Sequence, residues 1–546
     1  MWPHFRPGPA AGTQYTRSMQ TETKKRGSAD VLIAGAGPTG LVLALWLAKL
    51  GVRVRIIDKV AEPGTTSRAL AVQARTLEFY QQIGLARTVV ERGHKVPALN
   101  LWSRSKQAAR AELQNLGEGL TPFSFLMIYP QDEHERLLID RLREHSVEVE
   151  RRTELTGFED TGQGIRATIR GVDGLERTSS FSFLAGCDGA HSKVREGMHT
   201  DFSGGTYDHM FYVADVDAAG PPMNGELHVD LDDADFLAVF PLKGAGRARL
   251  IGSVRTDAAK DQRELRFEDV RDRAIQNLKI DVKHVNWFSS YRVHHRVAES
   301  FRKGRAFLLG DAAHIHSPVG GQGMNTGIGD AVNLAWKLAA ALRDPASAGL
   351  LDSYEPERIA FARRLVATTD RAFTGVISPS AMARFVRTEA VPKLLPGFFR
   401  VPQLRRLAFR TVSQIALNYR RSPLSAGKAG KVNGGDRLPW VRLDPRGVDS
   451  GNHTPLASLR WQIHIYGEAK SDIQTMCSTL RLPLHVFPWI EAMGNAGFAR
   501  DAIYLIRPDG YVALADSDAR VKSVSAYLEK HALTNVAGFE AYVGFA

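Results

Sequence analysis

The sequence predicts a mixed α/β (α+β) protein: a Rossmann-like nucleotide-binding domain is interrupted by a sheet-rich domain and followed by a separate C-terminal α/β domain. Three observations support this prediction. An apolar run at 31–34 leads directly into the spaced glycines Gly35, Gly37 and Gly40, as in a nucleotide-binding strand-turn-helix unit. Strand-like alternation of apolar and polar residues dominates 206–297. The 546 residues are too many for one hydrophobic core, so several domains are expected.

The composition is that of an ordinary globular protein, with 44% hydrophobic and 24% charged residues. No apolar run is long enough to predict a membrane span, and the N-terminus does not resemble a signal peptide. The two cysteines, Cys187 and Cys477, cannot form a disulfide framework. These features predict a cytoplasmic protein.

The net charge of +12 raises the question of a nucleic-acid partner. The basic residues are spread along the chain, and no zinc-finger or other nucleic-acid motif accompanies them, so no nucleic-acid partner is predicted. A basic excess equally favours anionic ligands such as dinucleotides or an aromatic acid.

Residues 1–28 are rich in Pro, Gly, Thr and basic residues and lack apolar periodicity, so we predict a flexible tail. Ordered structure is expected from Asp30 onward. Met19 is an alternative start of the chain.

The first nucleotide-binding motif has the context that its chemistry needs. A helix-like apolar segment follows Gly40, and an alternating second strand, 52–58, ends in an acid. The glycines allow a tight turn and close approach to a pyrophosphate at a helix start, and the acid suits ribose hydroxyls. An acid disfavours a 2′-phosphate, which points to the adenosine of FAD or NAD. The predicted cofactor-binding residues here are Gly35, Gly37, Pro38, Gly40, Asp58 and Lys59.

The third motif in chain order is a loop that joins a short buried strand, 306–309, to a helix that spans 328–342. At the end of this strand, Asp311 can accept hydrogen bonds from a sugar or ribityl hydroxyl, and the glycines that follow let backbone N–H groups approach a ring. An ordinary strand-loop-helix junction is the alternative. A further motif at 183–195, the second of the three in chain order, has a strand, an Asp188-Gly189 turn and a helix start; a common turn with Cys187 in the core is its alternative.

Together these motifs resemble the single-component (group A) FAD-dependent aromatic hydroxylases, the para-hydroxybenzoate hydroxylase and phenol hydroxylase superfamily. The match at 310–325 continues through 330–338. The resemblance implies an FAD domain of the glutathione-reductase type. It implies that Asp311 binds the ribityl chain of FAD, and that Asp188 and Arg195 shape the pyrophosphate site and the nicotinamide path. It further assigns the flavin loop to Pro318, Gly321, Gly323, Met324 and Asn325.

The resemblance also places Arg68 beside FAD and makes Gln131 a flavin-binding glutamine. Without it, Arg68 is a solvated charge and Gln131 part of a helix start that neighbouring acids favour. The phenol hydroxylase branch has a substrate-activating acid in the loop near 70, where this chain has Leu70. A direct transfer of that active site is therefore in doubt.

The resemblance implies five segments: the tail, the FAD-binding domain at 29–205, a substrate domain at 206–297, further FAD-domain and helical residues at 298–425, and a thioredoxin-like domain at 430–546. Residues 393–422 mix apolar residues with arginines, as a membrane-surface segment does, but Pro396 and Pro402 interrupt them and favour a helical dimer face or a domain-packing segment. A homodimer is expected in the first of these two cases, and 427–439 is predicted as a linker. The C-terminal domain has no Cys-x-x-Cys, so its role is expected to be structural. Candidate substrate contacts are Tyr212, His228, Phe236 and Phe240, and for each of them taken singly a core or surface position is the alternative that the residue type favours.

The function implied is an FAD-dependent monooxygenase that hydroxylates an aromatic, most readily a phenol, with NADH or NADPH and O₂ through a flavin C4a-hydroperoxide. A Baeyer–Villiger or epoxidising enzyme for a polycyclic metabolite is the alternative within the family. A plain NAD-dependent dehydrogenase and a non-catalytic flavin-binding or nucleic-acid-associated protein are alternatives outside it. No catalytic base is identified. His314 and His316 lack a third ligand, so no metal site is predicted.

Overall fold

The structure is a computed structural model that describes residues 29–64, 69–230, 236–254, 266–270, 273–317, 319–378, 380–444 and 451–535. The tail predicted for residues 1–28 lies outside these residues, and so do two predicted cofactor contacts, Arg68 and Pro318. The mixed α/β class predicted from the sequence is confirmed.

The nucleotide-binding domain is built on a six-stranded sheet in the order β18-β19-β12-β1-β2-β8. The central strands β19, β12, β1 and β2 are parallel, and β12 lies between β1 and β19. The carboxyl ends of parallel strands meet at one edge, so the three sequence motifs meet there too. The strands are β1 (Val31–Ala34), β2 (Val54–Asp58), β8 (Val149–Arg151), β12 (Phe183–Gly186), β18 (Arg302–Lys303) and β19 (Ala306–Leu308).

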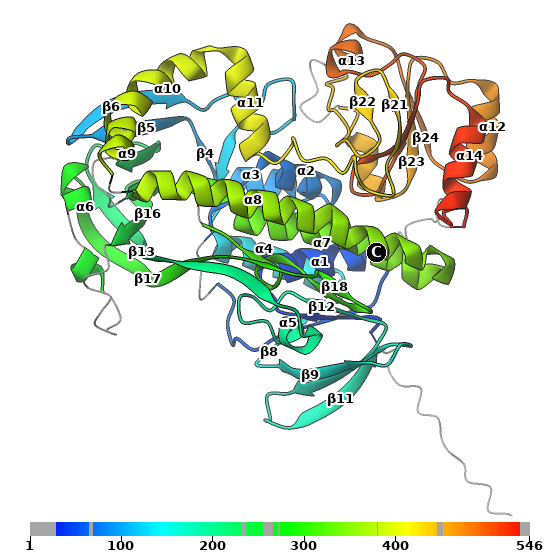
Figure 1. Cartoon of the computed structure of the whole chain (residues 1–546), viewed down its shortest axis with the longest axis horizontal. Coiled ribbons are helices and arrows are strands. Elements are labelled where there is room, and N and C mark those ends of the chain that lie inside the picture. Colours follow the sequence, from blue (N-terminus) through cyan, green and yellow to red (C-terminus); the bar gives the residue numbers. More distant parts are fainter. Residues whose placement is uncertain are drawn as a thin grey trace, which may run out of the picture.

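Helices cover this sheet and bury their apolar residues against it and against one another. In α1 (Pro38–Lys49), all positions from Gly40 to Leu47 are buried, and the helix packs against α7 (Gly323–Arg343) and α4 (Gln131–Glu144). The long helix α8 (Tyr354–Ile377) crosses the middle of the molecule, close to α7 (Figure 1). Three smaller helices are α2 (Ala74–Gln82), α3 (Ala86–Arg92) and α5 (Lys193–Met198). One small antiparallel sheet consists of β9 (Glu154–Asp160), β10 (Ile165–Arg170) and β11 (Glu176–Phe181), and another of β3 (Ala71–Val72), β7 (Leu126–Ile128) and β4 (His94–Val96).

A second, eight-stranded sheet has the order β20-β17-β13-β16-β15-β14-β5-β6. Two strands of this sheet, β5 and β6, come from residues 98–112, outside the predicted substrate segment of 206–297. Local patterns did not reveal this because the pairing of β5 with β14 joins residues more than a hundred positions apart. The strands are β5 (Ala98–Ser103), β6 (Lys106–Glu112), β13 (Phe202–Ala219), β14 (Leu227–Asp230), β15 (Leu237–Pro241), β16 (Arg247–Val254), β17 (Asp281–Ala298) and β20 (His314–Ile315).

The two faces of this sheet pack differently. One face is covered by the short helices η2 (Phe267–Val270) and α6 (Arg273–Asn277), with Tyr212 and Leu250 in its core. The other face packs on Leu70 and Ala74 of the nucleotide-binding domain and on Phe409. We call this second group the interdomain apolar cluster.

Residues 381–412 form α9 (Ala381–Phe385), a π-helical turn at 386–390, α10 (Val391–Arg400) and α11 (Pro402–Val412). Helix α10 packs on β6, and Phe409 of α11 belongs to the interdomain apolar cluster. Of the two roles predicted for this segment, the structure therefore contains domain packing.

The C-terminal domain has a six-stranded sheet in the order β22-β21-β26-β25-β23-β24. The segment predicted as a linker supplies β21 and β22, and β21 pairs in parallel with β26. These strands are too short for a recognisable alternation, and the partner of β21 lies far along the chain. The elements are β21 (Ala426–Ala429), β22 (Val432–Asn433), β23 (Gln462–Tyr466), β24 (Leu484–Phe487), β25 (Ile503–Ile506), β26 (Val512–Asp516), α12 (Ser471–Thr479), α13 (Glu491–Ala496) and α14 (Val521–Lys530). None of the helices in the described part of the chain combines the length and apolar character needed to cross a bilayer.

Candidate active site

The glycines of the first motif have different roles at the edge of the sheet. A Cβ on Gly35 would lie 2.2 Å from the Cys187 carbonyl oxygen, and a Cβ on Gly40 would lie 2.0 Å from the Gly35 carbonyl oxygen. These two positions therefore need glycine for packing. A Cβ on Gly37 would meet no atom within 4 Å, and α1 begins beside it without a side-chain cap. An open helix start with unpaired N–H groups is a site for an anion such as a pyrophosphate.

Asp58 organises this glycine loop. One of its carboxylate oxygens accepts from the Ala36 N–H at 2.7 Å, the other from the Val60 N–H at 2.8 Å, and Arg151 lies 3.5 Å away. Because a carboxylate can accept further bonds, these contacts leave capacity for a ribose hydroxyl. Neighbouring Lys59 is exposed.

Asp188 of the second motif caps α5. Its carboxylate accepts from the Ser192 hydroxyl at 2.5 Å and from the backbone N–H groups of Lys193 and Val194. Burial raises the pKa of Asp188, and the hydrogen bonds oppose that rise. The guanidinium of Arg195 donates to the Ala312 carbonyl at 3.0 Å, which ties this motif to the Asp311 loop.

In the third motif, Gly310 has a φ of 57°, and a Cβ there would lie 2.7 Å from the Thr39 hydroxyl on α1. The third motif thus packs directly on the first. Asp311 follows as an exposed residue at the same edge of the sheet, a position that a ligand bound along this edge can reach.

The Asn325 side chain is committed to protein contacts. Its Nδ2 donates to the carbonyls of Ala71 and Gly321, and its Oδ1 accepts from the Gln73 N–H and the Thr76 hydroxyl, all at 2.8–2.9 Å. These bonds use the whole hydrogen-bonding capacity of the amide. The Asn325 side chain therefore clamps the flavin loop to 71–76, and the predicted contact of this loop with the flavin through backbone N–H groups stays a prediction.

Gln131 has a similar positioning contact. Its Oε1 accepts from the Ala69 N–H at 3.2 Å, while its Nε2 donates to Glu135, which in turn accepts from the Gly64 N–H. The side chain therefore anchors both ends of the loop around the predicted Arg68. Of the other predicted flavin-loop residues, Gly321 has a φ of 60° beside Ala71, Gly323 begins α7, and Met324 packs partly buried on the main core.

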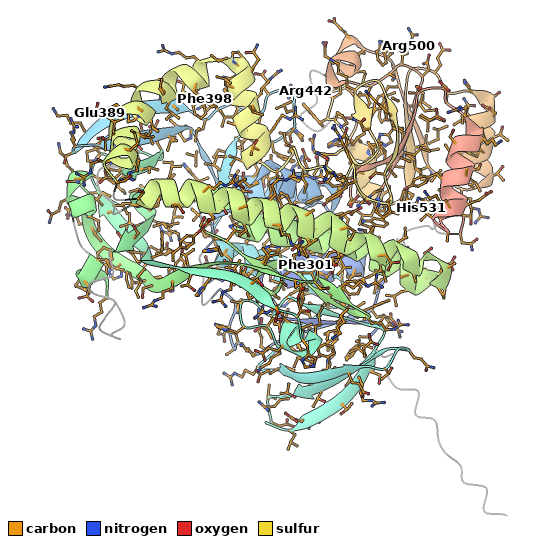
Figure 2. All side chains as sticks on the ribbon, in the orientation of Figure 1. Phe301, Glu389, Phe398, Arg442, Arg500 and His531 are labelled. Carbon is orange, nitrogen blue, oxygen red and sulfur yellow. The ribbon has the colours of Figure 1, made fainter. Side chains whose placement is uncertain are left out.

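The two loop histidines have separate environments. His314 lies 2.8 Å from the Asp330 carboxylate, and its ring packs near Phe301, labelled near the centre of Figure 2. The Nδ1 of His316 contacts the Ser317 carbonyl, and burial lowers its pKa to about 4. Within the described residues, no group of three or more His, Cys, Asp or Glu residues is arranged to hold a metal ion.

The structure separates the predicted substrate residues onto two faces of the large sheet. Phe240 packs against the interdomain apolar cluster. Tyr212 lies on the other face, where it stacks on Phe288, and His228 is buried with its ring bonded to Trp102 and Asn224. Tyr212 and His228 thus have core contacts on the face away from Phe240, which is the alternative left open for them, because the register of the sheet decides which face each residue occupies. The backbone N–H of Phe236 donates to the Ser253 hydroxyl, and the Phe236 carbonyl accepts from the Ser253 N–H.

Sequence reasoning missed an ion pair and two aromatic residues on the face toward the nucleotide-binding domain. Arg249, fully buried, makes a two-pronged contact with Asp215 at 2.6 and 2.8 Å and donates to the Ala69 carbonyl at 3.3 Å. Trp287 lies 5.7 Å from the Arg249 guanidinium, and Tyr291 packs partly buried on the same cluster. The sequence offered one signal for this site: Arg249 is a charged residue within a segment that alternates like a strand.

A cavity of about 380 Å³ lies elsewhere, between the 222–225 loop and the β15–β16 turn, with His94 in its wall. No residue of the three nucleotide-binding motifs lines this cavity. We therefore do not assign it to the cofactor.

Comparison with known sequences decides the family. The profile described as "FAD binding domain" matches residues 28–369, which is more than half of the chain. The chain belongs to the FAD binding domain family. Within this family its relatives are group A flavoprotein aromatic monooxygenases, so the predicted FAD cofactor and monooxygenase class are confirmed.

Two relatives and one solved structure define the likeness. The chain is 34% identical to 6-methylpretetramide 4-monooxygenase of Streptomyces rimosus, over 92% of this chain and 93% of the relative. It is 32% identical to pentachlorophenol 4-monooxygenase of Sphingobium chlorophenolicum, over 77% of each chain. The structure of OxyS anhydrotetracycline hydroxylase from Streptomyces rimosus aligns with a TM-score of 0.74 at 28% identity, covering 94% of this chain and 100% of that one.

The residues of this FAD-dependent monooxygenase fit its cofactor. The open space at Gly37 and the uncapped start of α1 suit a pyrophosphate, and the exposed Asp311 suits a polyhydroxylated chain. All three lie at the edge where β1, β12 and β19 end.

Proposed function

We propose that the protein hydroxylates an electron-rich ring of a polycyclic phenol, with NADH or NADPH as reductant and O₂ as oxidant. The observation that carries this proposal is the character of the sheet face beside the FAD domain. That face combines aliphatic residues with three aromatic side chains that are still partly exposed, Phe240, Trp287 and Tyr291, and its polar element is the Arg249–Asp215 pair. The full-length likeness to a 6-methylpretetramide 4-monooxygenase supports a polycyclic substrate.

Each part of the chain has a task in this reaction. Bound FAD supplies the electron transfer and oxygen activation. The glycine cradle and Asp311 hold and orient FAD, while the aromatic residues of the interdomain apolar cluster exclude water and stack on the substrate ring. Arg249, already bonded to Asp215, favours an anionic oxygen on the substrate near Trp287 and orients it.

We further propose that the FAD domain is of the glutathione-reductase type and that the C-terminal domain is thioredoxin-like. The antiparallel β9–β11 sheet inserted between β8 and β12 supports the first proposal. For the second, the support is the strand order β26-β25-β23-β24, with β23 and β24 parallel and β25 antiparallel to both neighbours.

We also retain the homodimer as a proposal. Support comes from exposed apolar side chains on α9–α11, among them Met382, Leu394 and Leu407. Sedimentation equilibrium of the intact protein tests it. A single monomeric species at all concentrations would contradict it.

The test of function is NADH and NADPH oxidation by FAD-loaded protein with three substrate classes: simple phenols, polycyclic phenols and polycyclic ketones without a phenol. We expect polycyclic phenols to stimulate oxidation most and to gain one hydroxyl group. Stimulation by simple phenols alone would contradict the polycyclic assignment. Stimulation by the ketones with ring expansion would replace hydroxylation by a Baeyer–Villiger reaction.

A further inference from the structure

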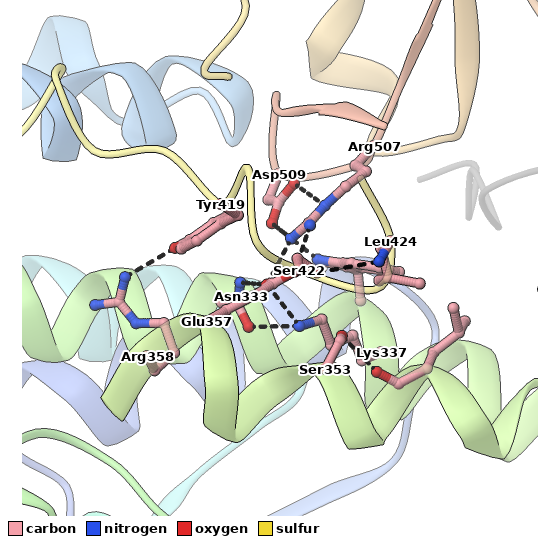
Figure 3. A network of polar contacts seen from close by, with 12 residues as sticks. Asn333, Lys337, Ser353, Glu357, Arg358, Tyr419, Ser422, Leu424, Arg507 and Asp509 are labelled. Atoms are coloured by element: carbon pink, nitrogen blue, oxygen red, sulfur yellow. Dashed lines mark hydrogen bonds and ion pairs between the residues drawn. The ribbon is translucent and has the colours of Figure 1, made fainter. Parts of the chain in front are cut away.

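Flavin binding leaves one part of the sequence motif without a role. The match to the family continues past the flavin loop to Asn333, Trp336 and Lys337 on α7, and all three side chains are buried. Figure 3 shows Asn333 and Lys337 directed toward α8 and the C-terminal domain. Buried polar side chains need partners, so these residues must serve a contact.

Trp336 donates to the Asp509 carboxylate at 3.1 Å, whereas Asn333 and Lys337 share a carboxylate on α8 as their partner. Glu357 accepts from Lys337 Nζ at 2.9 Å and from Asn333 Nδ2 at 2.6 Å. Glu357 also accepts hydrogen bonds from both terminal nitrogens of Arg507, at 2.7 and 3.0 Å (Figure 3). Arg507 is paired in turn with Asp509. Arg507 and Asp509 belong to the C-terminal domain. The side chains of all these residues are almost completely buried.

The next residue on α8 carries this contact toward the flavin site. Arg358 donates to Asp330 at 2.6 Å and to the Thr326 carbonyl at 3.0 Å, in the first turn of α7. The other carboxylate oxygen of Asp330 accepts from the Gly310 N–H at 3.0 Å. Gly310 is the residue directly before Asp311, so Arg358 is two hydrogen bonds from the backbone that presents Asp311.

Tyr419 connects Arg358 with residues of the C-terminal domain. The Tyr419 hydroxyl lies 2.8 Å from the third nitrogen of Arg358. The Tyr419 ring packs on Tyr511 of the C-terminal domain at 4.3 Å between ring centroids, and the Arg507 guanidinium lies 5.3 Å from it. The turn at 507–511 therefore supports Arg358 from the side opposite Asp330.

We infer that Arg358 is a positioning residue through which the C-terminal domain fixes the Gly310–Asp311 turn and thereby the affinity for FAD. The inference rests on the FAD assignment of the proposed function and adds a role for the C-terminal domain. A planar guanidinium with three fixed partners holds Asp330 in one orientation, and Asp330 holds the turn. Supporting contacts behind a binding group commonly change affinity by about 10–100-fold.

The test is the dissociation constant for FAD, measured by flavin fluorescence on the refolded or apo full-length chain. We expect Arg358→Met to weaken FAD binding by at least about tenfold, and Tyr419→Phe, which removes one hydroxyl, by about two- to fivefold. The matched control is Arg437→Met: Arg437 bonds Glu78 and the Leu120 carbonyl across the same domain interface but does not contact Asp330. We expect this control to lower stability and leave FAD affinity within about twofold.

Equal losses of FAD affinity in Arg358→Met and Arg437→Met would overturn the inference, because the interface would then act only through general stability. Unchanged affinity in Arg358→Met would overturn it as well. If Arg358→Met does not fold, Tyr419→Phe decides: an unchanged FAD affinity contradicts the inference and a loss supports it. The readout is FAD affinity, not turnover, so an error in the proposed substrate leaves the test intact.

Discussion

The FAD domain meets its two neighbours through interfaces that differ in their buried charge. Toward the large sheet it presents apolar residues such as Leu70 and Ala74, packed on Phe409 and other members of the interdomain apolar cluster. Toward the C-terminal domain it presents Glu357, which is buried and bonded to Arg507 of that domain. Apolar packing occurs at both interfaces, with Trp336 against Trp461 at the second, and the second interface adds a network of buried ion pairs.

In the proposed function, this difference would let one domain serve two ligands. Apolar packing tolerates changes of shape, so a substrate face built from it can accommodate a large aromatic molecule. Buried ion pairs tolerate little displacement because an unpaired buried charge is costly. The rigid side lies behind α7 and the Asp311 turn, where a cofactor has to be held in one orientation.

The largest expected effect comes from breaking the ionic interface at its centre. Glu357→Ala leaves Lys337 and Arg507 buried without this carboxylate, so we expect the free energy of unfolding to fall by about 3–5 kcal/mol. Chemical denaturation measures it. The control is Glu159→Ala, which breaks an exposed pair with Arg166 and should cost less than about 1 kcal/mol. Equal effects of the two substitutions would remove the contrast between the buried network and the surface.

Acid should weaken the ionic interface selectively. Arg507 and Lys337 outweigh the effect of burial and lower the pKa of Glu357, and Arg437 and Arg75 do the same for Glu78. A lowered folded-state pKa contributes stability above the unfolded value, and this contribution is lost as the pH falls below about 4.5. We expect the free energy of unfolding to drop by about 2 kcal/mol per group by pH 3, since each pH unit below the unfolded value costs about 1.4 kcal/mol. Denaturation between pH 6 and 3 tests this; a Glu357→Gln variant that kept the wild-type slope would contradict it.

Asp311→Ala should affect the cofactor while leaving both interfaces in place. Loss of a charged hydrogen-bond partner costs about 1.5–3 kcal/mol, which corresponds to roughly 10–100-fold weaker FAD binding. The purified protein should be weakly coloured. Asp173→Ala, at an exposed pair with Arg177, is the control and should retain FAD. Full FAD content with normal turnover in Asp311→Ala would refute the assignment.

A smaller effect is expected on the apolar side. Phe240→Ala should raise the KM for the substrate by about 2–10-fold without loss of FAD, since one aromatic contact is worth about 0.5–1.5 kcal/mol. Phe288→Ala removes the same side chain from the opposite face of the sheet, where Phe288 stacks on Tyr212. This control should lower stability without a matching change in KM. If Phe288→Ala changed KM more than Phe240→Ala, the substrate would lie on the other face.

The smallest effect is expected for Cys477→Ser in the C-terminal domain. The thiol is buried, and burial raises its pKa to about 11, so it stays protonated at neutral pH and is a poor nucleophile. Turnover should be unchanged within experimental error. A loss of several-fold in turnover at unchanged stability would indicate a chemical role for this domain.

Local patterns predicted the parts of the fold that are local in the sequence. The run from Val31 through Gly40 and the Asp188 and Asp311 turns each have their strand, turn and helix in one short segment, so spacing alone placed them. The pairing of β5 with β14 and of β21 with β26 could not be predicted, because it depends on strands distant in the chain.

Within the candidate site, residue type was predictable and orientation was not. Phe240 and Tyr212 read alike in the sequence, but the register of the sheet sends them to opposite faces. Asn325 lies in a recognised loop, yet its amide is consumed by contacts to 71–76. Arg249 and Arg358 were passed over because only the folded chain brings their carboxylate partners to them.

The most direct test of the central claim is isotope labelling with ¹⁸O₂. FAD-loaded protein is supplied with NADPH or NADH and a polycyclic phenol, and the product is analysed by mass spectrometry. A monooxygenase must place one ¹⁸O atom in the product ring and show substrate-dependent oxidation of the nicotinamide. Oxygen derived from water, or nicotinamide oxidation with no oxygenated product from any aromatic class, would contradict the account.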